Sequence, residues 1–401
     1  MVFKKDELKI LWPFYLESII ASVLFIAPAF WIIYFKDIGL SLFQIGLLFS
    51  AVSLFRFIFE VPTGAFADLY GRKNSVIFGT LLSGLGFLTL FYFSDFYILL
   101  LVFASFGLSI TFVSGADEAW VTDLIKKENK DLLHTYFTKK QSLWMFGSIF
   151  SGLIGSLFVK YFGLSIIFLV SSFSCLFSAF ILYFAKEAMV KTKDKSKYIF
   201  NNIKNHTIKA FNYSRHHHVL FYFFIAVIFI TLAGDFNDSL SWVPFFEELG
   251  LPDYMFGYLW SAMAFTGFIA PLIGSKLYKK NRERKFIISS LIFMIISALL
   301  VLFASNLIFA FIIFFTLLFF AHIKIPFERV YFHRFIPSKL RASIGSIESM
   351  IISIVEIFSF PLVGYIIDLI GSRYTIFLSG IIMIPAVLIY LKINDKKLTK
   401  K

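Results

Sequence analysis

Charged side chains stand inside several long apolar stretches of this sequence. They are Glu17, Arg56, Glu60, Asp117, Glu118, Asp235, Asp238, Lys324, Glu348 and Glu356. A charge surrounded by hydrocarbon is costly, and such residues nearly always face a helix-bundle interior or a water-filled cavity. All but Arg56 and Lys324 are carboxylates, which favours reversible binding of protons or cations.

The spacing of two pairs places their side chains on shared helix faces. Arg56 and Glu60 are four residues apart, and Asp235 and Asp238 are three apart. Residues at these separations are neighbours on a helix surface, so Arg56 and Glu60 are expected to be able to pair. For every charge in the set, the alternative is a structural ion pair or a head group that reaches the membrane interface.

The other charges differ in their expected depth and direction. Asp117 and Glu118 are consecutive, so their side chains point about 100° apart on a helix and at most one of them faces a cavity fully. Lys324 and Glu356 are expected near the membrane midplane, and Glu348 nearer the end of its span.

Other kinds of site have weaker support. The run His216, His217 and His218 has no further ligands beside it, so we expect an interfacial edge rather than a metal site. His322 could titrate near neutral pH but is more often a packing residue, and the single Cys175 allows no intramolecular disulfide. The sequence has no phosphate-binding loop and no clustered nucleophile or His/Asp constellation, so we expect no enzyme, no cofactor and no metal.

The composition places these charges in a protein with many membrane spans. The 401 residues are 59% apolar and 16% charged, whereas a soluble domain has about 45–50% and about 25%. A helix of about 20 apolar residues crosses the bilayer. The expected spans are 10–35, 40–68, 74–94, 97–125, 132–160, 164–185, 218–247, 253–279, 285–304, 306–334, 341–370 and 373–392. A soluble enzyme, a disordered chain and a nucleic-acid-binding domain are excluded.

The basic residues are distributed unevenly between the two sets of loops. The chain has 38 Lys and Arg residues and a net charge of +13. With the N-terminus in the cytoplasm, nearly all of them fall in loops on that side. The pattern predicts a multi-pass protein of the cell membrane with both termini cytoplasmic, and the positive charge needs no nucleic-acid partner.

An internal duplication divides the chain. Matches at a spacing near 210 include Trp31 with Trp242 and Gly39 with Gly250. We expect a six-helix half over 1–185, a basic cytoplasmic linker over 186–217 with a surface helix around Ile199–Tyr213, and a second six-helix half over 218–401 with a short basic tail. Parallel repeats of this kind are typical of transporters with a site between the halves. Every third span has no interior charge and is expected to face lipid.

One loop carries a specific motif, in which Gly64, Asp68, Gly71, Arg72 and Lys73 follow the pattern G-x-x-x-D-x-x-G-R-K. This loop resembles the corresponding loop of the major facilitator superfamily. With the span count and the duplication, the resemblance covers the whole chain. It implies an all-α polytopic membrane protein with twelve transmembrane helices in two pseudo-symmetric six-helix halves.

The resemblance also implies a gating role for the loop. Asp68 would dock at the start of the 341–370 span, near Ser338–Arg341, and place an anion at a positive helix end. In the second half the motif is reduced to Gly274 and a basic cluster, with Tyr278 where Asp68 would align. The 97–125 span lacks the Arg that many proton-coupled members of the family carry in their fourth span. The 132–160 span lacks the Gly-Pro signature that is frequent in the fifth span of the family's drug antiporters.

The main hypothesis is a secondary active transporter that moves a small organic solute by alternating access. It is expected to be coupled to protons, and export is one direction that this hypothesis allows. The alternatives are an uptake permease or facilitator of a small metabolite, and a non-transporting receptor on a transporter scaffold. The expected partners are a small-molecule substrate, protons and the lipid bilayer, and the expected oligomeric state is a monomer.

Overall fold

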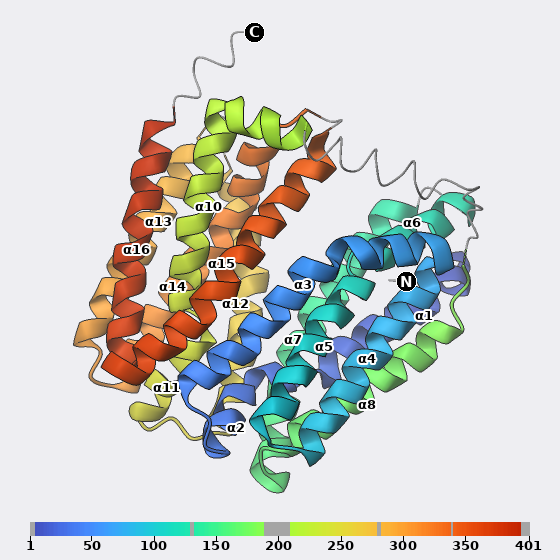
Figure 1. Ribbon diagram of the computed structural model, residues 1–401, viewed down its shortest axis with the longest axis horizontal. Helices are drawn as coiled ribbons and strands as arrows, with labels where there is room; N and C mark the ends of the chain where they lie inside the picture. The colour runs from blue at the N-terminus through green and yellow to red at the C-terminus, as the bar shows by residue number, and fades with distance from the viewer. Residues whose placement is uncertain (1–4, 129–131, 188–208, 279–281, 338–339, 394–401) are drawn as a thin grey trace. The chain divides into compact units, whose positions relative to one another are not determined.

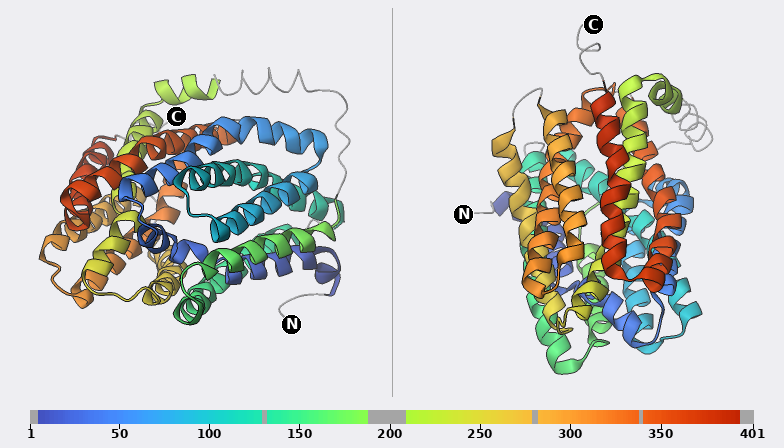
Figure 2. Two further views of the ribbon diagram at one scale, coloured as in Figure 1. Left: turned by 60° about the horizontal axis from the view of Figure 1, so that its bottom comes forward. Right: turned by 90° about the vertical axis from the view of Figure 1, so that its left-hand side faces the viewer.

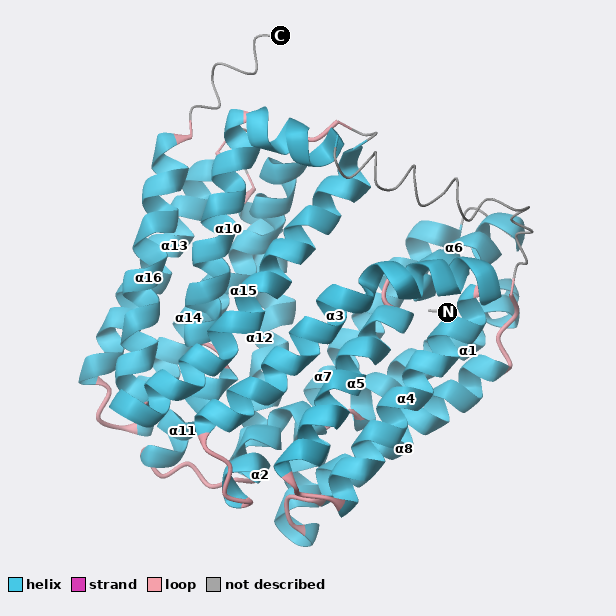
Figure 3. Ribbon diagram, in the orientation of Figure 1, coloured by secondary structure: helices cyan, strands magenta, loops and turns pink. Residues whose placement is uncertain are grey.

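The computed structural model describes residues 5–128, 132–187, 209–278, 282–337 and 340–393. Helices make up almost all of this part of the chain, and it contains no strand (Figures 1 and 3). Twelve helical runs in it are long and apolar enough to cross a membrane. Their limits lie within a few residues of the predicted spans, because the length of an apolar run is the strongest signal of a membrane helix.

The first six spans are formed by nine elements. They are α1 (Lys5–Leu24), η1 (Ala27–Ala29), α2 (Trp31–Asp37), α3 (Leu42–Tyr70), α4 (Arg72–Tyr92), α5 (Phe96–Val113), α6 (Ala116–Glu128), α7 (Leu132–Phe162) and α8 (Ile166–Tyr183). The other six spans are formed by eight further elements. They are α10 (His218–Phe236), α11 (Ser239–Glu248), α12 (Met255–Leu277), α13 (Glu283–Leu300), η2 (Val301–Phe303), α14 (Leu307–His333), α15 (Arg341–Ile370) and α16 (Ser372–Lys392).

Three of the predicted spans are interrupted in the structure. The first breaks at the 3-10 turn η1, which contains Pro28, and the seventh at Asn237–Asp238. The fourth breaks at Ser114–Gly115, where Gly115 has φ +69°, a conformation that other residues rarely adopt. Irregular backbone at membrane depth persists where it lines a polar interior, so these breaks mark places of interest.

Two predictions fall partly outside the described residues. Of the expected surface helix around Ile199–Tyr213, the structure describes a helix over 209–216, and the remainder lies outside. Of the expected start of the eleventh span at Ser338–Arg341, residues 338–339 lie outside. In the described part, α15 begins at Arg341 with Leu340 as its N-cap residue and without a side-chain cap. An aliphatic side chain has no acceptor for the first backbone N–H groups of the helix.

The described residues belong to two compact units. Unit 1 comprises Met1–Leu40, Leu47–Asp194 and Pro252–Phe265, and unit 2 comprises Ser41–Gly46, Lys195–Leu251 and Thr266–Lys401. The first turns of α3 therefore belong to unit 2, and the first half of α12 belongs to unit 1. This division differs from the predicted halves, 1–185 and 218–401, at those two short segments.

Within each unit the helices pack side by side as a bundle (Figure 2). In unit 1, α4 packs against α8 and α5, and α1 packs against α7; in unit 2, α13 packs against α14 and α16, and α10 against α16. The spans without interior charges are α4, α8, α13 and α16, and they expose large apolar side chains such as Leu85, Phe180, Ile296 and Leu388. Those surfaces suit contact with lipid.

For each span, we call the end beside the Lys- and Arg-rich loops the basic end and the other the opposite end. The basic end of α3 is at Tyr70, followed by Arg72 and Lys73. The basic end of α15 is at Arg341, so α3 and α15 run in opposite directions between the two kinds of end.

Candidate functional site

A cluster of charges lies inside unit 1 where α1, α6 and α7 meet. The ammonium of Lys140 on α7 lies 2.5 Å from a carboxylate oxygen of Asp117, in the first turn of α6 directly after the break at Gly115. Both side chains are about three quarters buried, with 23% and 22% exposed. The same ammonium lies 5.9 Å from the ring centre of Tyr136, which adds a cation–π contact.

Glu17 on α1 gives this cluster a second carboxylate. Glu17 interacts electrostatically with both Lys140 and Asp117. It accepts a hydrogen bond from the hydroxyl of the neighbouring Ser18, at 3.3 Å. One ammonium thus serves two acidic groups, and the group that it leaves uncompensated can bind a proton or a cation.

Sequence reasoning missed the basic half of this cluster, because it counted Lys139 and Lys140 only among the basic residues of the cytoplasmic side and not among the candidate site residues. Both lie within α7, and Lys139 is 2.6 Å from Glu7, which is 1% exposed and also accepts a hydrogen bond from Tyr15 at 2.5 Å. The signal was available: a pair of lysines inside the predicted 132–160 span, at the same end as Asp117.

A second acidic group lies in unit 2 at the break between α10 and α11. The buried Asp235 accepts a hydrogen bond from the hydroxyl of Ser359 on α15. Asp235 also interacts electrostatically with Asp238 and Glu356. Asn237, in the break itself, accepts a hydrogen bond from the indole of Trp242 at 2.9 Å. The predicted Asp235–Asp238 neighbourhood is therefore present, although the helix is interrupted between the two residues.

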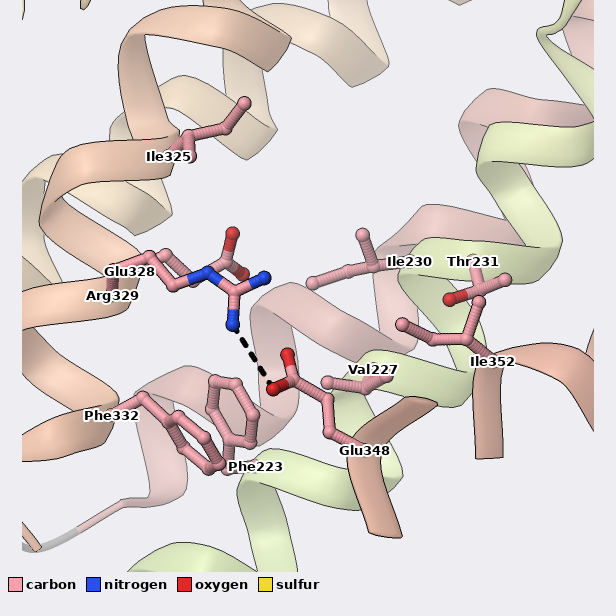
Figure 4. Close-up of a pocket in the computed structure, with 10 residues that line it drawn as sticks. All are labelled: Phe223, Val227, Ile230, Thr231, Ile325, Glu328, Arg329, Phe332, Glu348 and Ile352. Carbon is pink, nitrogen blue, oxygen red and sulfur yellow. Dashed lines mark hydrogen bonds and ion pairs between the residues drawn. The ribbon is translucent and has the colours of Figure 1, made fainter. Parts of the chain in front are cut away.

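A pocket of about 220 Å³ lies in unit 2 between α10, α14 and α15 (Figure 4). Its lining is mostly apolar and consists of Phe223, Val227, Ile230, Thr231, Ile325, Glu328, Arg329, Phe332, Glu348 and Ile352. Arg329 and Glu348 face each other in it, 3.1 Å apart. A mostly apolar lining with one arginine–glutamate pair suits a small organic molecule that carries a polar group.

The predicted Lys324 lies beside this pocket and is nearly buried. Its ammonium is 2.8 Å from Glu328, which lines the pocket and also accepts a hydrogen bond from Tyr390 at 3.2 Å. Lys324 is thus tied to a pocket residue rather than directed freely into the pocket.

The structure does not bring the Arg56–Glu60 pair together. Among the described residues no ion pair joins them; Glu60 is exposed and accepts a hydrogen bond of 3.5 Å from Ser114 at the α5–α6 break. Glu118 is also exposed, while its neighbour Asp117 pairs with Lys140. Consecutive helical positions point in different directions, so only one of these two carboxylates reaches α7.

The motif loop forms a tight junction between α3 and α4. Gly71 has φ +99° and separates the two helices. Lys73 donates to the carbonyls of Tyr183 and Ala185 at 2.7 and 2.8 Å, and Arg72 forms an ion pair with Asp123. Asp68 is exposed, and within the described part of the chain its carboxylate has no partner.

No metal site is evident in the part of the chain that the structure describes, since it contains no group of three or more His, Cys, Asp or Glu residues that could hold an ion. Burial lowers the pKa of His217 from its ordinary value, and its ring accepts the N–H of Leu220 at 3.4 Å. This histidine caps the start of α10, a structural role.

Comparisons with known proteins agree with this architecture. A sequence model of the Major Facilitator Superfamily matches residues 18–347. The uncharacterised MFS-type transporter YxaM of Bacillus subtilis (strain 168) is 26% identical over 272 residues, 64% of this chain and 63% of that protein. An uncharacterised MFS-type transporter of Methanocaldococcus jannaschii is 27% identical over 173 residues, 43% of this chain and 44% of that protein. This chain spans less than two thirds of the length of either relative.

Solved structures share the fold at low sequence identity. A bacterial homologue of the iron transporter ferroportin, in an inward-facing state, has a TM-score of 0.75 and 15% identity, covering 96% of this chain and 98% of that one. A bacterial homologue of the human lysosomal transporter Spinster has a TM-score of 0.73 and 13% identity, covering 97% of each chain. At these identities the likeness is one of fold.

Proposed function

Because the chain belongs to the Major Facilitator Superfamily, we propose that it is a secondary transporter that moves a small organic solute across the membrane by alternating access. The family resemblance and the all-helical, twelve-span fold class predicted from the sequence are both confirmed. The observation that carries the proposal is a polar site inside the spans: one ammonium between two carboxylates in unit 1. A transporter needs groups of this kind, whereas a purely structural bundle gains little from them.

The excess of carboxylates over ammonium groups in the unit 1 cluster supports proton coupling. Lys140 neutralises one acidic group at a time, so Asp117 and Glu17 compete for it. When Glu17 binds a proton, Lys140 pairs with Asp117 alone, and the two carboxylates compete for the ammonium again when the proton leaves. A proton is thereby linked to a change in the contacts among α1, α6 and α7.

The orientation is that of a cell-membrane protein with both termini in the cytoplasm. The supporting observation is the concentration of Lys and Arg in the loops at the basic ends of the spans. The pocket beside Arg329 and Glu348 is the candidate solute site, and its pair of opposite charges suits a polar organic molecule. The same cycle operates as export or as uptake, depending on the gradients.

A flux assay on reconstituted protein tests transport and coupling together. Purified protein is placed in sealed vesicles that contain a pH-sensitive dye, and a panel of organic cations, anions and zwitterions is added outside. We expect at least one solute to change the internal pH, and a protonophore to remove the solute's accumulation. Binding without flux would favour a receptor, and flux that ignores both the dye and the protonophore would favour a facilitator.

A further inference from the structure

The gate motif between α3 and α4 has a second copy in the chain. Gly64, Asp68, Leu69 and Gly71 recur 300 positions later as Gly364, Asp368, Leu369 and Gly371. The second copy joins α15 to α16, so it lies at the opposite end of its span. The internal duplication at a spacing near 210 does not relate the two loops.

The two loops have the same local structure. Gly371 has φ +85°, close to the value at Gly71, and each glycine alone separates the two helices that it joins. A basic side chain follows in each loop and caps the end of a neighbouring helix. Arg373 donates to the carbonyls of Leu302 and Val301 at 3.1 and 3.5 Å, as Lys73 does at the end of α8. Cations at helix C-termini are favourable for the same reason in both places.

The second aspartate is bound to the start of another helix. Asp368 accepts the backbone N–H of Leu42 at 3.1 Å through one oxygen and that of Phe43 at 2.9 Å through the other. These are the first two residues of α3, and all of these groups belong to unit 2. The exposed carboxylate therefore forms a bridge between α15 and α3.

The start of α3 satisfies its other N–H groups without help. The hydroxyl of Ser41 accepts the N–H of Gln44 at 3.2 Å, and the Gln44 side chain accepts the N–H of Ser41 at 3.0 Å. This capping box leaves the N–H groups of Leu42 and Phe43 without an acceptor in their own helix. The two carboxylate oxygens of Asp368 are the acceptors for these two N–H groups.

Glycines let α15 approach α3 closely in this unit. A Cβ atom at Gly364 would lie 2.1 Å from the carbonyl oxygen of Leu42, and one at Gly46 would lie 2.3 Å from that of Phe360. Both obstacles are backbone atoms, which no change of rotamer can move. The contact between Asp368 and α3 is thus part of a close helix–helix packing.

We propose that Asp368 is a second gate residue, which locks the opposite ends of α3 and α15 as Asp68 locks their basic ends in the other state. The inference rests on the proposed alternating-access function. The two helices run in opposite directions, so the aspartate near the C-terminus of each can cap the N-terminus of the other. A parallel duplication relates the second span to the eighth, and an inverted repeat within the second half relates the eighth to the eleventh, so the two operations together generate such a relation.

The two gate aspartates differ in their contacts in the structure. Asp368 is engaged with α3, whereas Asp68 is exposed and without a partner within the described residues. The N-cap residue of α15, Leu340, offers no side-chain acceptor to the first N–H groups of that helix. One lock closes as the other opens.

Cysteine accessibility tests the proposal without any substrate. The variants are made in a Cys175→Ser background. Ser50→Cys reports on the part of α3 near its opposite end, and Ser349→Cys reports on the part of α15 near its basic end. Each cysteine is labelled with a membrane-impermeant maleimide added on the side of the membrane where that helix end lies. Ser50 is nearly buried and Ser349 is exposed. Asp368→Asn should raise labelling at Ser50→Cys and lower it at Ser349→Cys, by about fivefold in their ratio.

A second variant, which removes the same contact from the other helix, distinguishes loss of the contact from misfolding of one variant. Leu42→Pro removes one N–H donor at the first helical position, where proline is tolerated, and should shift labelling in the same direction. Asp95→Asn is the matched control, because Asp95 caps the start of its own helix through Tyr97 and Ile98 and joins no second span. It should leave the labelling ratio unchanged.

The variant of the first gate residue should change the labelling in the opposite direction. Asp68→Asn removes the competing lock and should lower labelling at Ser50→Cys. Wild-type labelling in both Asp368→Asn and Leu42→Pro would overturn the proposal, as would an equal shift in Asp95→Asn. A shift of the expected sign in a protein that moves no solute would sustain the gate and refute the transport function.

Discussion

Replacing Lys140 by Gln is expected to remove the pH response of transport and to lower its rate by at least about tenfold, a change of about 1.4 kcal/mol. The ammonium of Lys140 is the common partner of Asp117 and Glu17. Removing one member of a buried ion pair costs about 3–5 kcal/mol, and less where the pair is about a quarter exposed, as it is here. Without the ammonium, the two carboxylates no longer have a common partner to exchange. The measurement is the solute-dependent pH change in dye-loaded vesicles.

The adjacent lysine provides the control. Lys139→Gln removes a lysine one position away, which forms an ion pair with Glu7. We expect it to lower the melting temperature while the pH response of transport persists. The double variant Lys140→Gln with Asp117→Asn restores the net charge of the wild-type cluster and should recover stability without coupling. A Lys140→Gln protein that keeps the wild-type pH response would refute the proton site.

The limits of the spans could be predicted from the sequence, but the partners of the charges could not. Apolar length locates a helix to within a few residues, and it leaves the rotation of that helix about its axis undetermined. This is why the pairing of Asp117 with Lys140, which joins two helices, could not be predicted. Arg56 and Glu60 lie on one helix and could pair, but Glu60 accepts a hydrogen bond from Ser114 on the chain between two other helices. The interruption at Gly115 was hidden because the residues before it continue the apolar run.

The second gate motif was visible in the sequence and was missed for a physical reason. The predicted repeat at a spacing near 210 relates spans that run in the same direction, such as those that contain Trp31 and Trp242. Asp68 and Asp368 lie on helices that run in opposite directions, so they match only under inverted symmetry. Hydrogen bonds from Leu42 and Phe43, not the repeat itself, identified Asp368.

Adding one methyl group at Gly152 is expected to lower the melting temperature, whereas the same change at a glycine with free space around it is expected to raise it. In unit 1, a Cβ at Gly152 on α7 would lie 2.1 Å from the carbonyl oxygen of Gly257 on α12, and one at Gly257 would lie 2.3 Å from that of Gly152. The hydroxyl of Ser261 also donates to the carbonyl of Ile149 at 2.6 Å across the same contact. Since the obstacles are backbone atoms, the two helices must separate to admit the methyl group.

An overpacked contact costs about 1–3 kcal/mol, so Gly152→Ala should lower the melting temperature and reduce solute flux about tenfold. Gly234→Ala in α10 is the matched control, because a Cβ there meets nothing within 4 Å. In a helix, Ala is more favourable than Gly by about 0.5–1 kcal/mol, so the control should raise the melting temperature and preserve flux. If Gly152→Ala behaves like Gly234→Ala in both measurements, close approach of α7 to α12 is not required for the cycle. If it lowers flux while the melting temperature rises, the contact matters for the conformational change rather than for folding.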